Sequence, residues 1–186
     1  MTLNEMDMKV LALIEELNPE SENLTDDPDI VAKKRYVTNQ VMFELARIKK
    51  IPKYIEFSAT VGELVDFSTL EKECGYEVYQ IDTVSGVKCS PKASGTVYKI
   101  LESGTVCFDL FVYPERITEK TKGNYEFELS NDVLEIMPYG IAADLLKSDV
   151  SAEYGSVYAT RYESMKQQLD PRYAMGMVTI EGGITV

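Results

Sequence analysis

Hydrophobic residues at the start of the chain follow a helical period. Thr2 and Glu5 have the spacing of a capping box, which predicts a helix that begins at the N-terminus. The apolar residues that follow at intervals of three or four are Met6, Val10, Leu13 and Leu17. This spacing predicts an amphipathic helix.

A second helix is predicted after the polar segment NPESENLTDDPD. Asp27 is a good N-cap residue, Pro28 suits the first helical position, and Asp29 complements the helix dipole. The predicted buried stripe consists of Ile30, Val37, Val41, Leu45 and Ile48. We expect this helix to run to about Lys50 and to be stopped by Pro52.

The period changes to alternation in residues 52–129. Ile55, Phe57, Ala59 and Val61 alternate with polar residues, and GYEVYQIDTVSGVKC and NYEFEL add further strand signals. The segment GTVYKILESGTVCFDLFVYP predicts two strands around a Ser103-Gly104 turn. One face of the second strand is predicted to carry Val106, Phe108, Leu110 and Val112. Half a dozen short strands indicate a small antiparallel sandwich or barrel.

Helical spacing returns in residues 130–170. Ser130 or Asn131 can cap a helix over DVLEIMPYGIAADLLKSD, in which Pro138 predicts a kink or a break into two helices. Ser151 is expected to cap a last helix. One face of this helix carries Tyr154, Val157, Tyr158, Arg161, Tyr162, Met165 and Leu169.

The element order, helix, helix, sheet, helix, helix, places the chain in the α+β class. Neither helical half has enough apolar surface to stand alone. We therefore predict one helical bundle built from the N-terminal helices of residues 1–51 and the C-terminal helices of residues 130–170. A small antiparallel β-domain, residues 52–129, is inserted between them, and residues 171–186 follow as an extended C-terminal tail.

The composition indicates an ordinary globular protein, with 45% hydrophobic and 27% charged residues. No apolar run approaches the roughly 20 residues of a membrane helix, so no membrane partner is expected. The N-terminal segment has acids where a secretory signal would have lysines, and it lacks a cleavage site, which favours synthesis in the cytoplasm.

The net charge of −12 argues against ordinary nucleic-acid binding, because phosphate contacts need clustered Lys and Arg. The basic runs Lys33-Lys34-Arg35 and Lys49-Lys50 are interpreted as solvated helix faces. An acidic surface can nevertheless stand beside DNA without gripping it.

Candidate chemistry is sparse. The chain has no histidine, which excludes imidazole catalysis, and Cys74, Cys89 and Cys107 form no C-x-x-C pair, which argues against zinc. No Gly-rich phosphate loop is present. Acidic pairs such as Glu15-Glu16 leave a carboxylate hydrolase conceivable, if two acids converge in a pocket and one has a raised pKa. We therefore predict no catalytic residue, no cofactor and no metal.

Two features of the last helix point to packing or assembly. Tyr154, Tyr158 and Tyr162 form an i, i+4, i+8 ladder, which suits either the core of the bundle or a face between subunits. Gly155 costs about 1 kcal/mol in a helix relative to alanine. It predicts that another backbone packs close to this position.

The tail has an apolar character unusual for a chain end. Residues 175–186 carry no Lys or Arg and one acid, Glu181. Such a segment can fold onto its own sheet or add to the sheet of a neighbour, and the Gly pair favours reaching outward. The predicted assembly residues are Met175, Met177, Val178, Ile180, Gly182, Gly183 and Ile184.

One known family shares this arrangement of motifs. The segment LSNDVLEIMPYGIAADLLKSDVSAEYGSVYATRYESMKQQLDPR, residues 129–172, resembles the C-terminal helical segment of tailed-phage head–tail connector (adaptor or neck) proteins. The shared features are an apolar helix with an embedded Met-Pro, an acidic turn, and a second helix containing Arg161-Tyr162-Glu163. The segments YPERITEKT, YEFELSNDVLEIMPYG and EGGI are also similar to connector-type proteins.

The resemblance implies a structural protein of the virion neck, made in the cytoplasm of a host bacterium. Connector proteins are not enzymes, and they form a homo-oligomeric ring below the portal protein. The implied neighbours are the portal protein above, a downstream neck or tail-completion protein below, and DNA that passes without specific binding. The tail would dock on the portal or on an adjacent subunit.

A different class of function stays open beside this one. The β-domain could be a binding module that recognises a carbohydrate or a host surface, with the helices acting as a stalk. Its aromatic platform would consist of Tyr76, Tyr79, Tyr98 and Tyr113.

Overall fold

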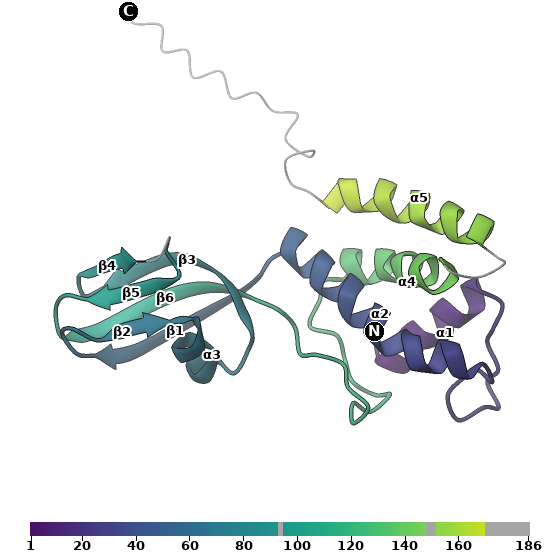
Figure 1. The fold of residues 1–186 in the computed structure, drawn as a ribbon, viewed down its shortest axis with the longest axis horizontal. Coiled ribbons are helices and arrows are strands. Elements are labelled where there is room, and N and C mark those ends of the chain that lie inside the picture. The colour runs from purple at the N-terminus through teal and green to yellow at the C-terminus, as the bar shows by residue number, and fades with distance from the viewer. Residues whose placement is uncertain (93–94, 148–151, 170–186) are drawn as a thin grey trace, which may run out of the picture.

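Two lobes lie side by side along the long axis of the molecule in a computed structural model, which describes residues 1–92, 95–147 and 152–169 (Figure 1). One contains the strands and the other most of the helices. The chain is mixed α+β, with five helices and two small antiparallel three-stranded sheets in these residues. The predicted α+β class is confirmed. We call residues 51–112 the β lobe and the remaining described residues the helical lobe.

The first two helices begin where their capping residues predict. For α1 (Leu3–Leu13), the Glu5 N–H donates to Thr2 Oγ1 at 3.2 Å and the Thr2 N–H donates to Glu5 Oε2 at 2.9 Å. For α2 (Pro28–Ile48), Asp27 Oδ1 accepts from the N–H groups of Asp29 and Ile30. Each cap satisfies amide groups that have no partner inside the helix.

Helix α2 ends close to the predicted Lys50, but the role predicted for Pro52 is wrong. The helix ends at Ile48, and Pro52 lies inside strand β1 (Ile51–Ala59), opposite Phe111. Because β1 is an edge strand, its proline can face away from the sheet without breaking a hydrogen-bonded ladder. Pro52 therefore belongs to the strand and does not act as the helix stop.

Helix α4 (Asn131–Leu146) lies between α5 (Ala152–Leu169) on one side and α1 and α2 on the other (Figure 1). A helix in that position is apolar on all sides. Its buried residues are Val133, Leu134, Ile136, Met137, Pro138, Gly140, Ile141, Ala142, Leu145 and Leu146. The helix continues through Pro138, so of the two alternatives, a kink or a break into two helices, the break is wrong.

Two glycines allow α4 and α5 to approach closely. A Cβ at Gly155 of α5 would lie 3.1 Å from Leu146 Cβ and 3.5 Å from the Ala143 carbonyl oxygen, so the predicted close packing at Gly155 is confirmed. A Cβ at Gly140 of α4 would lie 2.8 Å from the ring of Tyr162. Larger residues at either position would push the two helices apart.

The β lobe contains both sheets. One has the order β1-β6-β3, with β6 (Gly104–Val112) between β1 and β3 (Val78–Gly86). The other has the order β2-β5-β4, formed by Leu64–Asp66, Val97–Ile100 and Cys89–Lys92. The predicted inward face of β6 is confirmed, because Val106, Phe108, Leu110 and Val112 are all buried.

The two strands predicted around Ser103-Gly104 are present as β5 and β6, but they belong to different sheets and do not pair with each other. Two other local predictions in this part of the chain are wrong. A helix, α3 (Phe67–Cys74), lies where only strands are predicted, capped by Asp66 and ended by Gly75 at φ 76°. The segment NYEFEL forms only an isolated bridge, between Glu126 and Thr2.

Each lobe has its own hydrophobic cluster. The cluster of the helical lobe combines buried residues of α1, α2, α4 and α5 with those of the segment that connects β6 to α4, which are Tyr113, Ile117, Phe127 and Leu129. The cluster of the β lobe is formed around Val65, Leu70, Ile100 and Phe108. The connecting segment therefore packs with the helices although it follows the last strand.

Candidate interaction surfaces

The three tyrosines of the ladder on α5 lie in three different environments. Tyr162 is 6% exposed, and its hydroxyl donates to Glu44 Oε2 at 3.0 Å. Tyr158 is half-buried and donates to the Leu13 carbonyl oxygen at 2.6 Å, whereas Tyr154 is 68% exposed. Successive steps of four residues turn by about 40° around a helix, so the ladder winds from the core to the surface.

The Tyr162 hydroxyl, at the buried end of the ladder, is held in its protonated form and donates a hydrogen bond. Burial, together with the nearby Glu44 carboxylate, raises the pKa of the Tyr162 hydroxyl. Lys166 lies 2.7 Å from Glu44 Oε1 and completes the cluster. Tyr162 is therefore a packing residue, while Tyr154 and Val157, which is 62% exposed, form an apolar outer face of α5.

A hollow of about 530 Å³ opens between α1, α4 and α5. We call it the α1–α4–α5 groove. Its apolar lining includes Leu13, Pro138, Tyr139 and Met165, and its charged lining includes Lys9, Glu135 and Arg161. The Arg161 guanidinium lies 4.2 Å from the centroid of the Tyr139 ring, so it is fixed as part of the wall.

A second hollow, of about 160 Å³, adjoins Tyr154 and Tyr158. Leu13 lines both hollows. Since Tyr158 is bonded to the carbonyl oxygen of Leu13, the end of α1 and the middle of α5 form one continuous surface with a hollow on each side.

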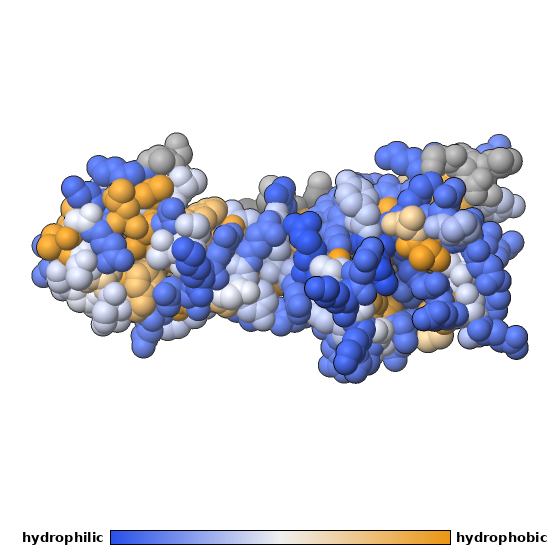
Figure 2. Space-filling model, turned by 60° about the horizontal axis from the view of Figure 1, so that its bottom comes forward, coloured by the Kyte–Doolittle hydropathy of each residue, from blue (hydrophilic) through white to orange (hydrophobic). Residues whose placement is uncertain are grey.

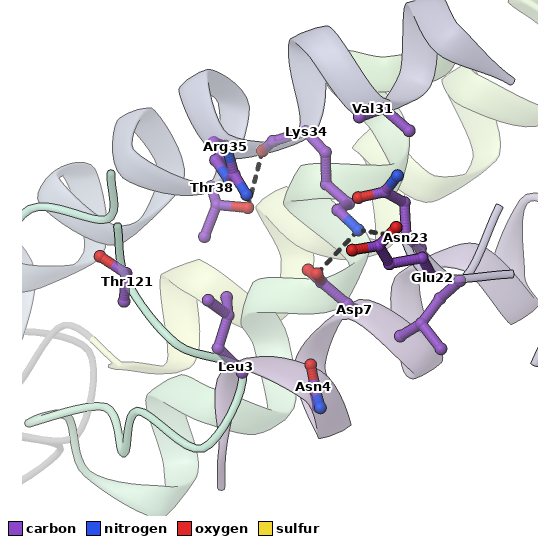
Figure 3. Close-up of a pocket in the computed structure, with 12 residues that line it drawn as sticks. Leu3, Asn4, Asp7, Glu22, Asn23, Val31, Lys34, Arg35, Thr38 and Thr121 are labelled. Carbon is purple, nitrogen blue, oxygen red and sulfur yellow. Dashed lines mark hydrogen bonds and ion pairs between the residues drawn. The ribbon is translucent and has the colours of Figure 1, made fainter. Parts of the chain in front are cut away.

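Lys34 of α2 is buried, which corrects the interpretation of Lys33-Lys34-Arg35 as a solvated face. Figure 3 shows its ammonium group pointing to Asp7 of α1, with Nζ 2.7 Å from Oδ2 and 3.3 Å from the Asn23 carbonyl oxygen. Burial raises the pKa of Asp7, and the opposing effect of Lys34 is smaller. The signal was in the sequence, because Lys34 falls on the stripe of Ile30, Val37 and Val41.

This ion pair involves an acid of the kind that a carboxylate hydrolase would use. Asp7 and Glu22 line one hollow of about 160 Å³, and Asp7 has the raised pKa that such an enzyme needs. However, the Asp7 carboxylate is occupied by Lys34, and the hollow is smaller than the roughly 300–1,000 Å³ of ligand sites. The pair joins α1 to α2, and the hydrogen bond from Lys34 to the Asn23 carbonyl oxygen holds the connection between these helices against α2.

The junction between the lobes is a stack of aromatic and cationic groups. Tyr113 lies between Phe43 and Tyr79, with ring centroids 4.7 Å away on each side. Arg47 contacts the Tyr113 hydroxyl, and Arg116 lies over the ring of Phe43. These groups come from α2, from β3 and from the segment after β6.

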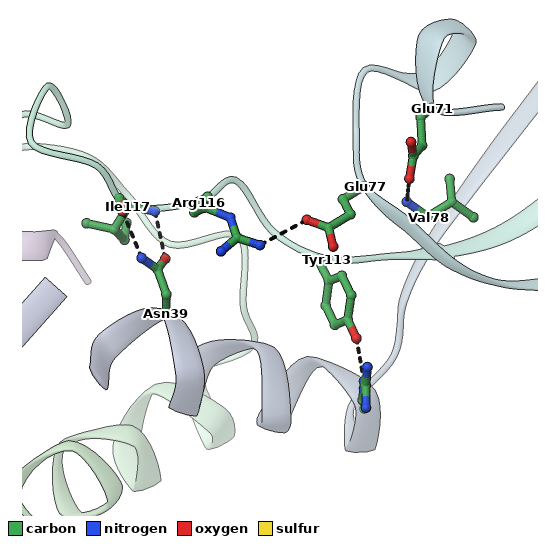
Figure 4. Close-up of polar contacts among 8 residues, drawn as sticks. Asn39, Glu71, Glu77, Val78, Tyr113, Arg116 and Ile117 are labelled. Carbon is green, nitrogen blue, oxygen red and sulfur yellow. Dashed lines mark hydrogen bonds and ion pairs between the residues drawn. The ribbon is translucent and has the colours of Figure 1, made fainter. Parts of the chain in front are cut away.

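Hydrogen bonds hold the segment after β6 on both sides, as Figure 4 shows: Asn39 fixes it to α2 within the helical lobe, and Arg116 binds Glu77 of the β lobe. Asn39 of α2 donates to the Ile117 carbonyl oxygen and accepts from the Ile117 N–H, both at 2.8 Å. Arg116 pairs with Glu77 at 3.2 Å. The two lobes are therefore joined by a packed interface in addition to the chain crossings.

The four tyrosines of the alternative binding platform do not share one exposed face. Tyr79 and Tyr113 stack on each other at the junction, and burial raises the pKa of Tyr79 to about 12. Tyr98 packs edge-on against Phe108 in the core of the β lobe. Tyr76 and Tyr113 line a hollow of about 370 Å³ together with Glu77, Pro114 and Arg116.

Exposed aliphatic residues gather at the far end of the β lobe. Val61, Leu64 and Leu101 are at least half exposed. Val61 and Leu101 lie in the β1–β2 and β5–β6 turns, and Leu64 is the first residue of β2. Hydrogen bonds from the Gly62 N–H to the Ile100 carbonyl oxygen and from the Ile100 N–H to the Glu63 carbonyl oxygen join the turns. Figure 2 shows apolar surface, in orange, over much of the β lobe, while the helical lobe is mostly hydrophilic in the same view.

The tail residues predicted for assembly lie outside the described residues, as does Ser151. They are Met175, Met177, Val178, Ile180, Gly182, Gly183 and Ile184.

In residues 1–92, 95–147 and 152–169, no group of three or more His, Cys, Asp or Glu side chains is placed to hold a metal ion. None of the helices in this part of the chain is long and apolar enough to cross a membrane. All three cysteines are free, and burial raises the pKa of the Cys89 thiol.

No protein-family model matches the sequence, and no curated protein is significantly similar to it.

Proposed function

We propose that this protein is a head–tail connector of a tailed phage, which assembles as a homo-oligomeric ring below the portal protein and surrounds the DNA channel. The observation that carries the proposal is the exposed apolar face of α5, formed by Tyr154 and Val157, on the helix where the resemblance to connector proteins lies. Exposed tyrosine and aliphatic side chains on an otherwise polar helix are typical of interfaces.

The proposed architecture is one helical bundle, interrupted by the β lobe. It is supported by the hydrophobic cluster of the helical lobe, in which residues of α1 and α2 pack with residues of α4 and α5. In the proposed ring the bundle forms the body of each subunit. The β lobe extends to one side, where its exposed aliphatic turn residues can brace a neighbouring protein.

A ring requires two different surfaces on each subunit, because each copy contacts the next one head to tail. The outer face of α5 is the first of these surfaces in the proposal. The elongated shape of the molecule supports the idea that a second surface lies far from the first, at the exposed turns of the β lobe (Figure 1).

The charge of the chain agrees with a channel through which DNA passes. A net charge of −12 disfavours phosphate binding, so DNA would not be held as it moves. In the proposal the portal protein lies above the ring and a downstream neck or tail-completion protein lies below it. The apolar tail is the anchor to the portal or to an adjacent subunit.

Quantitative mass spectrometry of virions from the phage that encodes this chain tests the proposal directly. The expected result is a copy number equal to that of the portal ring. Absence of the protein from purified virions overturns the proposal.

Variants separate the surface from the fold. Val157→Ser is expected to lower incorporation into virions without changing the melting temperature, because the side chain is exposed. Gln167→Ser, at another exposed position of α5, is the matched control and should incorporate normally. Deletion of residues 174–186 should leave the fold intact and abolish incorporation, and normal incorporation of that variant would rule out the tail as an anchor.

A further inference from the structure

The α1–α4–α5 groove has the size and the chemistry of a peptide-binding site. Its volume of about 530 Å³ falls within the range of about 300–1,000 Å³ typical of ligand sites. The apolar part of its lining, from Leu13 to Met165, is bordered by the cations Lys9 and Arg161 and the single acid Glu135. An apolar segment with a negative charge therefore suits this groove.

The chain itself carries such a segment close by. Helix α5 ends at Leu169, four residues after Met165, so the groove begins about 6 Å from the end of the helix along its axis. Residues 170–186 follow, and 17 residues can span up to about 56 Å when extended. The groove is well within reach of this segment.

We propose that the groove binds the C-terminal segment of the same chain, residues 174–186, folded back along α5. Asp170-Pro171 favours a turn, because Pro cannot continue a helix and Asp-Pro pairs commonly initiate turns. The four residues 170–173 provide the reversal. This inference concerns the free chain and does not depend on the proposed assembly role.

The composition of the segment matches the groove. Met175, Val178 and Ile180 offer apolar side chains, and methionine adapts readily to irregular hollows such as the one beside Pro138. Glu181 is the only charged residue of the segment, and it would lie among side chains with one more positive than negative charge. Apolar burial supplies the stabilisation, and the charge fixes the direction of the segment.

Binding within one chain is favoured over binding between chains because of effective concentration. A short flexible connection keeps a segment at millimolar concentration near its site. A tail from a second copy, or a peptide of another protein, has to compete with a segment held at this effective concentration.

Cysteine cross-linking in the full-length chain tests the inference. The test variant carries Ala12→Cys, on the groove, and Val178→Cys. The control carries Ser164→Cys, one residue from Met165 but not part of the groove lining, and Val178→Cys. Ala12 and Ser164 are both exposed, so neither change should disturb the fold. The native cysteines lie in the β lobe and are distinguished by peptide mapping after oxidation.

We expect the 12–178 disulfide to form within one chain and on the order of tenfold faster than the 164–178 disulfide. Adding Met165→Asp to the test variant should abolish that advantage, whereas Gln168→Asp, at an exposed position, should not. Equal rates for the two cysteine pairs overturn the inference. So does a 12–178 disulfide found only between chains, with a yield that rises with protein concentration. Absence of the protein from virions would refute the connector proposal and leave this result unaffected.

Discussion

The helical lobe and the β lobe build their cores from the chain in different ways. The buried cluster of the helical lobe includes Leu3 near one end of the chain and Leu169 near the other, so it closes only when distant segments meet. The cluster of the β lobe comes from residues 51–112 alone. Contacts between distant segments are entropically costly to close, whereas contacts within one segment are less so. The difference indicates that the β lobe can hold its structure with less help from the rest of the molecule.

The lobes also differ in their buried polar groups. The helical lobe contains the Asp7–Lys34 ion pair, with both side chains largely buried, and the hydroxyl of Tyr125, which has no partner among the described residues. The β lobe cluster is formed by apolar side chains with one buried aromatic ring, Phe108, at its centre. Among the described residues the helical lobe thus buries a charged pair, whereas the core cluster of the β lobe is apolar.

The largest expected loss of stability comes from removing a core side chain, and it should be confined to the lobe that contains the change. Phe108→Ala should destabilise the β lobe by about 3–5 kcal/mol, because it removes a fully buried ring. Hydrogen exchange measured by mass spectrometry should show loss of protection in β1, β3 and β6 with little change in α4. Met42→Ala, in α2, is the matched change and should affect the helices instead. Equal loss of protection in both lobes after either change would contradict the comparison.

The next effect concerns the buried ion pair. Lys34→Met should cost about 3 kcal/mol at neutral pH in urea denaturation, because the carboxylate of Asp7 is left buried without a partner. The exposed neighbour provides the control, since Lys33→Met should change the free energy of unfolding by less than about 0.5 kcal/mol.

The pH dependence of this variant follows from the pKa of Asp7. Burial holds that pKa above the ordinary value of 3.8 in the folded chain, so the folded chain binds a proton before the unfolded chain as the pH falls. Loss of the Lys34 charge raises the pKa further. The destabilisation by Lys34→Met is therefore largest at neutral pH and shrinks on acidification towards the pKa of Asp7. A loss independent of pH between neutrality and that point would contradict the burial of an unpaired carboxylate.

A smaller effect is expected within the helical lobe, where the segment after β6 packs against α2 beside the junction. Asn39→Ala should cost about 2 kcal/mol, because it leaves the N–H and the carbonyl group of Ile117 without their partner. The Ile117 amide should exchange faster, and limited proteolysis should reach residues 113–129 sooner. Gln40→Ala is the exposed control. Unchanged exchange at Ile117 would mean that the segment after β6 is held on α2 without the two Asn39 hydrogen bonds.

The smallest expected effect is a gain in stability, whereas the changes above lower the free energy of unfolding. Tyr125→Phe should raise the free energy of unfolding by about 1 kcal/mol, since it removes a buried hydroxyl that has no partner in the described part of the chain. Tyr98→Phe in the β lobe is the comparison. A drop in stability for Tyr125→Phe, measured by thermal denaturation, would show that its hydroxyl is bonded in solution.

The elements predicted correctly are those with local signals. The caps at Thr2 and Asp27 depend on residues within one helical turn, and the alternation of Val106 and Phe108 describes its own strand face. Helix α3 was not predicted, although Asp66 and Gly75 are typical residues for the start and the end of a helix. Its eight residues contain too few apolar positions to show a helical period. Short elements of this kind are decided by what they pack against.

The errors in tertiary arrangement have another cause. The pairing of β6 with β1 and β3, in place of β5, depends on contacts between distant strands, and a turn signal such as Ser103-Gly104 does not specify them. The groove was not predictable for the same reason. Leu13, Pro138 and Met165 are separated by long stretches of chain and meet only when three helices are assembled.

The register of the first sheet has a consequence for the gene as well as for the protein. Ile51 and Val112 are directly paired, so the chain enters and leaves the β lobe at neighbouring points, with Cα atoms about 5 Å apart. An in-frame deletion between these residues would leave two ends that a short turn can join, without pulling α2 away from the segment that follows β6. A single genetic event could thus remove the lobe, exchange it for another, or add it to a purely helical ancestor.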